Sequence, residues 1–139
     1  MRLDAAEAQA RFIASDVVRL ATAGADGAPH LVPCTFAVNG SGRIVIGIDS
    51  KPKSSTDLRR LRNIAANPRV SLLADHYSND WAQLWWARAD GLAAVEPFGE
   101  DHAAHWELLR GKYPQYDALV PTGPVIVVTV QSWSGWAFA

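Results

Sequence analysis

Residues 50 to 69, SKPKSSTDLRRLRNIAANPR, combine positive charge and hydroxyl groups in a way that suits an anionic ligand. The segment holds six of the thirteen Lys and Arg residues and only one acid, whereas the whole chain has a formal net charge of −1. The positive charge is therefore a local excess. Guanidinium and ammonium groups, with hydroxyl donors beside them, are the groups that hold phosphates in proteins.

The second half of this segment has the spacing of a helix over residues 56–67. Pro68 ends it, because the residue before a proline is pushed out of the helical region. Ser54 and Asp57 have the spacing of a capping box, which predicts a helix start among the hydroxyl residues 54–56. A helix start presents unpaired N–H groups and a partial positive charge, and so favours a bound anion. The apolar side of the helix is expected to be Leu58, Leu61 and Ile64 or Ala65.

The three arginines of this helix are not expected to share one face. Arg59 and Arg62 are three residues apart and lie on one side, whereas Arg60 is rotated by about a third of a turn. We therefore expect only part of the set to reach one ligand. The alternative is that they are solvated charges, paired with Asp49, Asp57 or Asp75.

The elements that would position this segment read as helix, three strands, helix, two strands, helix, strand. The order predicts one domain, residues 1–139, that is mainly β: six antiparallel strands in a closed or partly closed barrel, with peripheral helices. Turns are expected at 25–27 and 39–42, and a bulge or bend at Gly91. The first helix is expected to bury the stripe Leu3, Ala6, Ala10 and Ile13. The strands are expected within 17–38 (two), at 43–48, 69–75, 82–96 and 123–138, and the helices at 3–15, 56–67 and 99–113.

Composition narrows the function classes. No apolar run approaches the ~18 residues that span a membrane, and charges interrupt the first fifteen residues where a signal peptide needs its apolar stretch. One cysteine, Cys34, excludes an internal disulfide and fits a reducing, cytoplasmic location. The near-neutral charge argues against general nucleic-acid binding.

Three stretches carry a family resemblance: RLATAGADGAPHLVPCTFAV, LRRLRNIAANPRVSLLAD and LWWARADGLAAVEP. Together, over roughly residues 16–97, the chain resembles the split-barrel flavin and deazaflavin oxidoreductases. These form the pyridoxamine 5'-phosphate oxidase-like superfamily, and the likeness is to its branch that uses the deazaflavin coenzyme F-420. The resemblance implies an FMN-binding split barrel, a homodimer with the cofactor at the subunit interface, and hydride transfer to or from a small organic substrate.

The resemblance also implies which residues hold the cofactor. In relatives, a Lys or Arg on the segment leading into the Arg62-Asn63 helix end binds the cofactor phosphate, and Arg60 stands at a position that is often lysine. The connection before it is longer here and carries Lys51 and Lys53, which leaves open which cation takes the phosphate. The expected cofactor-binding set is Ser50, Lys51, Lys53, Ser55, Arg59, Arg60 and Arg62.

The substrate pocket is expected to involve His76, Trp81 and Trp86. In a strand, Trp86 and Arg88 face one way and Trp85 the other, so one tryptophan must meet something other than the core. It could line a dimer interface, where Trp and Arg are enriched, or stack on a flat ring. His76 could donate a hydrogen bond to the substrate or be a turn histidine with no chemical role.

The sequence offers no acid–base pair, triad or metal set. Cys34 lies among apolar residues and is interpreted as a small buried hydrophobe. His102 and His105 are three residues apart, but no third ligand is implied, and they are interpreted as residues of a surface helix. No catalytic residue and no metal are predicted, which fits hydride transfer by a positioned cofactor.

Three other functions stay open. With FMN in place of the deazaflavin, the protein would be an oxidase or reductase of the pyridoxamine-phosphate-oxidase type; the longer anionic tail of the deazaflavin favours that coenzyme over FMN beside so many cations. Without turnover, it would carry a flavin, a deazaflavin or haem. Nucleic-acid binding through the arginine helix would show a steep dependence on salt.

Overall fold

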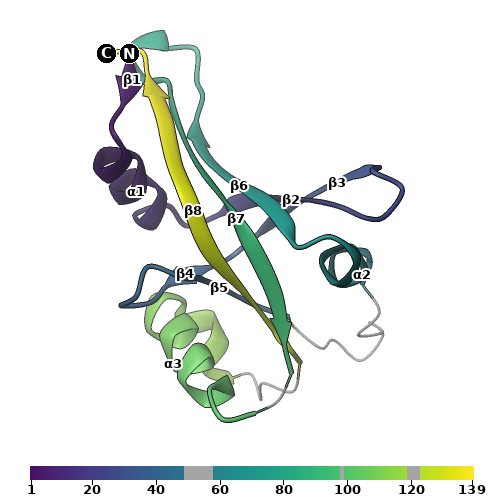
Figure 1. The fold of residues 1–139 in the computed structure, drawn as a ribbon. Helices are drawn as coiled ribbons and strands as arrows, with labels where there is room; N and C mark the ends of the chain where they lie inside the picture. Colours follow the sequence, from purple (N-terminus) through teal and green to yellow (C-terminus); the bar gives the residue numbers. More distant parts are fainter. Residues whose placement is uncertain (49–57, 98, 119–122) are drawn as a thin grey trace.

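The computed structural model describes residues 1–48, 58–97, 99–118 and 123–139 (Figure 1). Within these ranges the longest helix, α3, has eleven residues, and no helix is long and apolar enough to cross a membrane. The elements are, in order, β1 Arg2–Leu3, α1 Ala5–Ile13, β2 Val18–Ala23, β3 Pro29–Cys34, β4 Ala37–Val38, β5 Ile44–Gly47, α2 Arg59–Ala66, β6 Arg69–His76, η1 Trp81–Gln83, β7 Trp85–Glu96, α3 His102–Lys112, η2 Pro114–Ala118 and β8 Val125–Ala137.

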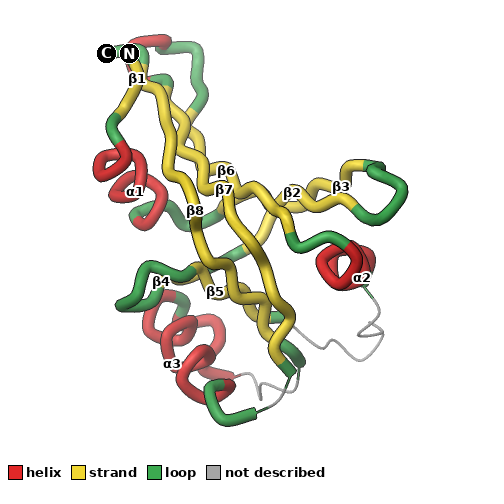
Figure 2. The backbone as a smooth tube through the Cα atoms, in the orientation of Figure 1, coloured by secondary structure: helices red, strands yellow, loops and turns green. Residues whose placement is uncertain are grey.

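The described strands form one antiparallel sheet in the order β3-β2-β6-β7-β8-β5-β4, with β1 paired to β8. The sheet curls around β7 and β8, its two longest strands, and the helices lie outside it (Figure 2). The fold is therefore mainly β with peripheral helices, and the split-barrel prediction is confirmed.

The described part of the sheet has eight strands, where six were expected. The predicted second strand breaks after Cys34, because the backbone N–H and carbonyl of Phe36 both lie within hydrogen-bond distance of the Tyr113 hydroxyl. Phe36 is thus held by a side chain of α3's C-cap and not by a neighbouring strand, and β4 starts after it. The other additional strand, β1, is a two-residue pair with the end of β8.

Both predicted turns are present. Gly27 has a φ of 78°, its N–H donates to the Gly24 carbonyl, and an Asp26 carboxylate oxygen accepts from the N–H of Ala28. Gly42 has a φ of 82°, and the Asn39 side chain accepts from backbone N–H groups of the same turn. Glycine adopts positive φ without strain, so these two residues fix the two connections.

The predicted irregularity at Gly91 is a β-bulge. Asp90 pairs with Ser132 and Gly91 with Val130, so Gln131 on β8 is the extra residue. A Cβ atom at Gly91 would lie 2.3 Å from the carbonyl oxygen of Thr129. Only glycine allows the two strands to approach this closely at the bulge.

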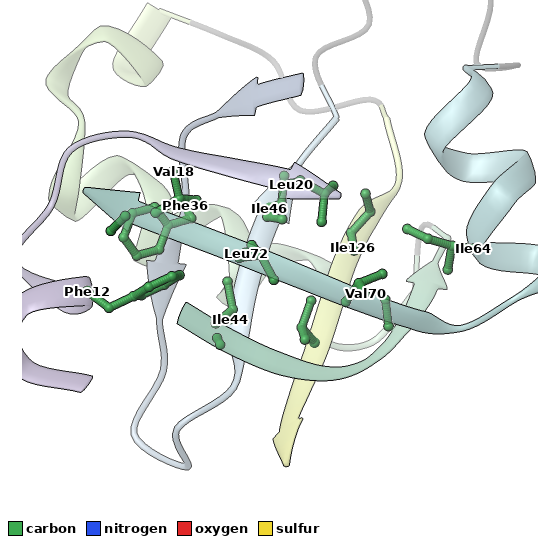
Figure 3. Close-up of a cluster of buried hydrophobic side chains, with 14 of the residues drawn as sticks. Phe12, Val18, Leu20, Phe36, Ile44, Ile46, Ile64, Val70, Leu72 and Ile126 are labelled. Carbon is green, nitrogen blue, oxygen red and sulfur yellow. The ribbon is translucent and has the colours of Figure 1, made fainter. Parts of the chain in front are cut away.

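The core lies inside the curl of the sheet (Figure 3). Helix α1 contributes Ala8 and Phe12, both fully buried, and the Phe12 ring meets Phe36 and Trp133 edge-on at centroid distances of 5.0 and 5.1 Å. The predicted stripe on this helix is therefore wrong: Leu3 lies in β1, and Ile13 is 41% exposed.

Candidate functional site

Helix α2 starts later than its capping signal predicted. Its N-cap is Leu58, which has extended dihedral angles and makes no side-chain capping bond, so the helix does not begin among residues 54–56. The two residues of the predicted capping box, Ser54 and Asp57, lie outside the described residues. Leu58 packs against the core, and this apolar contact accompanies the helix start. The predicted cofactor residues Ser50, Lys51, Lys53 and Ser55 lie outside the described residues.

The arginines of α2 divide as the helical spacing predicted. Arg59 and Arg62 are exposed, whereas Arg60 is half-buried. The Nε atom of Arg60 is buried and has no hydrogen-bond partner among the described residues. A buried guanidinium nitrogen without a partner is costly, so this atom is well suited to an anion that the protein binds.

The charge of Arg60 acts on Cys34 of β3. Burial raises the pKa of the Cys34 thiol from 9.0 to about 11, although the positive charge of Arg60 by itself lowers this pKa. The thiol is therefore protonated at neutral pH, which supports the interpretation of Cys34 as a small buried group and argues against a nucleophile.

A polar junction joins α2 to the β2–β3 hairpin. The side-chain amide nitrogen of Asn63 donates to the Thr22 hydroxyl over 3.0 Å, and both residues are buried. Thr22 pairs with His30 on β3, whose Nδ1 is buried and lacks a partner in the described part of the chain. Arg60 lies one turn before Asn63, so two unpartnered buried nitrogens belong to this junction. Sequence reasoning missed Asn63 and gave His30 no role.

The predicted substrate-pocket residues are not brought together. His76 pairs with Trp85 and lines an open hollow of about 450 Å³ together with Arg11 and Asp75. Trp81 is 67% exposed on a single 3-10 turn. Trp86 faces the opposite side of the sheet from Trp85, as predicted, because successive strand residues alternate.

Trp86 belongs to a hollow of about 500 Å³ on that outward side. We name it the Trp86–Trp136 hollow. It is lined by Arg2, Leu3, Trp86, Arg88, Trp133, Ser134, Gly135 and Trp136, and strand pairing puts five of them, Arg2, Trp86, Arg88, Ser134 and Trp136, on the same side of the sheet. The guanidinium carbon of Arg88 lies 5.5 Å from the centroid of the Trp86 ring, which is cation–π geometry. Sequence reasoning found Trp86 and Arg88 but missed the lining residues on β1 and β8.

A second open groove, of about 570 Å³, lies on the outward face of β2, β6 and β7. Arg69 and Asn67 line it next to the end of α2, and Asp90 lines it beside the bulge. The Asp90 carboxylate accepts from the Ser71 hydroxyl and pairs with Arg88 at 2.9 Å. Leu92 pairs with Arg69 and is 38% exposed, so apolar surface borders this groove.

Helix α2, which carries the arginines, and the tryptophans Trp85 and Trp86 lie at opposite ends of β6. Strand β6 starts at Arg69, just after α2, and its far end, His76, pairs with Trp85. Seven residue steps in a strand span about 23 Å. Figure 1 shows β7 starting beside the chain termini, away from α2. Within one chain, the expected phosphate anchor and the expected aromatic wall are therefore separate.

The histidines of α3 have structural surroundings. His102 lies on the buried side of α3, and its Nε2 is 2.8 Å from the Gly123 carbonyl oxygen. His105 lies 3.1 Å from a Glu96 carboxylate oxygen. Across the described ranges, no three His, Cys, Asp or Glu residues are grouped so that they could hold a metal ion.

The chain is similar to known proteins both in a family pattern and in fold. A family model described as pyridoxamine 5'-phosphate oxidase matches residues 5–137. A conserved hypothetical protein from Mycobacterium tuberculosis is 23% identical, with a TM-score of 0.76 over 97% of this chain and 85% of its own. A FAD-binding protein from Mesorhizobium loti is 21% identical, with a TM-score of 0.72 over 97% and 95%. A FAD-binding protein from Mycobacterium smegmatis is 20% identical, with a TM-score of 0.64 over 99% and 98%. No curated protein matches the sequence.

Proposed function

Because the chain belongs to the pyridoxamine 5'-phosphate oxidase family, we propose that it is an oxidoreductase that binds a flavin-type cofactor, the deazaflavin coenzyme F-420. The reaction is the transfer of a hydride between the bound deazaflavin and a small organic molecule. Two similar structures are named as FAD-binding proteins, which supports a cofactor with a flavin-like ring and a phosphate-bearing tail.

The observation that carries the proposal is the state of Arg60. Its Nε is buried without a partner among the described residues, at the junction where His30 Nδ1 is also unpartnered. A phosphate oxygen would satisfy the guanidinium and remove the cost of leaving it unpaired. In this proposal Arg60 grips the phosphate, and Asn63 positions α2 through its bond to Thr22.

The exposed cations around Arg60 favour the deazaflavin over FMN. Arg59 and Arg62 lie on the solvent side of α2, and the sequence adds Lys51 and Lys53 just before it. FMN ends at its phosphate, whereas F-420 continues into an anionic polyglutamyl tail that these side chains could follow. They would act mainly by attraction at a distance, which is weaker than the paired contact of Arg60.

A homodimer would bring α2 of one protomer close to the tryptophans of the other. A two-fold axis that sets the β6 strands of two copies antiparallel would bring α2 of one protomer next to the Trp86–Trp136 hollow of its partner. Exposed Leu31 and Leu92, on the outward face of β3 and β7, provide apolar surface for such a contact. When bound there, the cofactor would supply the hydride. The protein's own residues would hold its phosphate, orient its ring and exclude water.

The deciding experiment is titration of the apoprotein with F-420 and with FMN, followed by the cofactor's absorption and fluorescence. We expect F-420 to bind more tightly. Arg60→Gln should weaken it by roughly ten- to hundredfold, the cost of one charged hydrogen bond of about 1.5–3 kcal/mol. Arg59→Gln is the matched control, because it removes the same charge from the neighbouring exposed position and should change affinity by less than about threefold. Lys53→Ala tests the other candidate anchor.

Three results would contradict parts of the proposal. Tighter binding of FMN, with a yellow purified protein, would make the protein a flavin enzyme. Equal losses in Arg59→Gln and Arg60→Gln would remove the anchor role of Arg60. Tight F-420 binding without any reduction or oxidation of the coenzyme across a panel of acceptors would indicate a carrier. Sedimentation of the complex measures the dimer independently.

A further inference from the structure

The Trp86–Trp136 hollow is built from three strands that place five of its side chains on one side of the sheet. Arg2 of β1 pairs with Trp136 of β8, and Trp136 pairs with Trp86 of β7. One step along the same face, Ser134 pairs with Arg88. Residues paired across antiparallel strands point to the same side, so two indoles, two guanidinium groups and one hydroxyl line one hollow.

The hollow carries excess positive charge. Arg88 gives its Nε to the Asp90 carboxylate at 2.9 Å, and its side chain stays 46% exposed over the Trp86 ring. The Arg2 side chain makes no hydrogen bond or ion pair with any residue of the described ranges. Asp90 therefore offsets one of the two arginines at most, and its other carboxylate oxygen is taken by Ser71.

The Ser134 hydroxyl adds an unpartnered group. Its Oγ is buried and has no hydrogen-bond partner in the part of the chain that the structure describes. A buried hydroxyl without a partner costs free energy, and that cost is recovered when a ligand oxygen pairs with it.

We propose that the Trp86–Trp136 hollow binds a flat organic anion of the aromatic carboxylate class. Indole faces stack on a flat ring, and guanidinium groups bind a carboxylate through paired N–H donors. A volume of about 500 Å³ fits a small organic ligand. The further claim that this anion is the substrate of the oxidoreductase rests on the proposed function. The claim that it binds to the apoprotein does not depend on the proposed function.

The test uses 2-naphthoate as the probe, added to the ¹⁵N-labelled apoprotein without any cofactor. The indole N–H signals of Trp86 and Trp136 should shift on binding, and the titration gives the affinity. Arg2→Gln and Arg88→Gln should each weaken 2-naphthoate by about tenfold or more. Arg43→Gln, an exposed arginine in the turn before β5, is the matched control and should leave the affinity unchanged. Neutral 2-naphthamide should bind the unaltered protein at least tenfold more weakly than the acid.

Ser134→Ala should weaken 2-naphthoate severalfold and leave Tm unchanged or higher, which separates loss of a ligand contact from loss of folding. The proposal is overturned if 2-naphthoate and 2-naphthamide bind equally, if neither arginine variant differs from Arg43→Gln, or if only signals of tryptophans outside the hollow (Trp81, Trp85 and Trp106) shift. Because no cofactor is present, failure of F-420 or FMN to bind would leave this result intact. Conversely, absence of naphthoate binding would leave the cofactor assignment intact.

Discussion

The side-chain amide of Asn63 on α2 donates to the Thr22 hydroxyl on β2 over 3.0 Å, and this bond ties the arginine helix to the sheet. We expect Asn63→Ala to lower the free energy of unfolding by about 1–3 kcal/mol, because it removes a buried hydrogen bond and leaves Thr22 without its partner. Urea denaturation measures the change. Asn79→Ala, in the exposed turn before η1, is the control and should change stability by less than about 0.5 kcal/mol.

The same variant tests the position of Arg60. If Asn63 orients α2, Asn63→Ala should also weaken cofactor binding while Arg60 itself is intact. A stability loss equal to that of Asn79→Ala would contradict the role of this bond in the fold.

Gly91→Ala should be strongly destabilising, because the added Cβ would lie 2.3 Å from the Thr129 carbonyl oxygen. Overpacking of this kind costs about 1–3 kcal/mol or more, and relief would require β7 and β8 to separate at the bulge. Thermal unfolding checks the size of the loss. Gly111→Ala is the matched comparison: its Cβ would meet nothing within 4 Å, and it lies in α3, where alanine is favoured over glycine by about 0.5–1 kcal/mol. The two variants should therefore shift Tm in opposite directions.

The sequence predicted those parts of the fold that depend on local chemistry. Asp26-Gly27 marks a hairpin because glycine takes the positive φ that the turn needs, and Gly91 marks the bulge for a steric reason. The buried face of α1 was not predictable by periodicity alone, because Leu3 is held in a strand by the end of β8, which is more than 130 residues away in sequence.

The candidate sites were predictable in part for the same reason. Arg60 could be separated from Arg59 and Arg62 because helical rotation is a local property. The Trp86–Trp136 hollow could not be assembled, since its residues come from β1, β7 and β8 and meet only through strand pairing. Register between distant strands is set by the whole sheet, and a single sequence does not state it.

Tyr113→Phe should loosen the contact between α3 and the strands. The Tyr113 hydroxyl accepts from the Phe36 N–H at 3.1 Å and lies 2.7 Å from the Asp16 carbonyl oxygen, to which it can donate. Loss of these two hydrogen bonds should lower the free energy of unfolding by about 1–3 kcal/mol. It should also reduce the hydrogen-exchange protection of the Phe36 amide. Tyr77→Phe removes a hydroxyl from a side chain that is 61% exposed and should have little effect. Unchanged protection at Phe36 would contradict the contact.

Cys34 should make stability fall at alkaline pH. Burial raises the pKa of its thiol in the folded protein from 9.0 to about 11, with Arg60 opposing the shift. The unfolded chain therefore loses this proton first, so the stabilising contribution is complete below pH 9 and is lost as pH rises to about 11.

We expect this thiol to lower the free energy of unfolding by up to roughly 2–3 kcal/mol across that range, since each pKa unit corresponds to about 1.4 kcal/mol. Tyrosine and lysine side chains titrate in the same range, so the measurement is a difference. Urea unfolding of the unaltered protein and of Cys34→Ala at pH 7, 9, 10 and 11 isolates the thiol, because the variant lacks this ionisable group and keeps all the others. Above pH 9 the free energy of unfolding should fall more steeply for the unaltered protein than for Cys34→Ala. Parallel curves would show that the thiol ionises equally in the folded and unfolded chains and is therefore not buried beside α2.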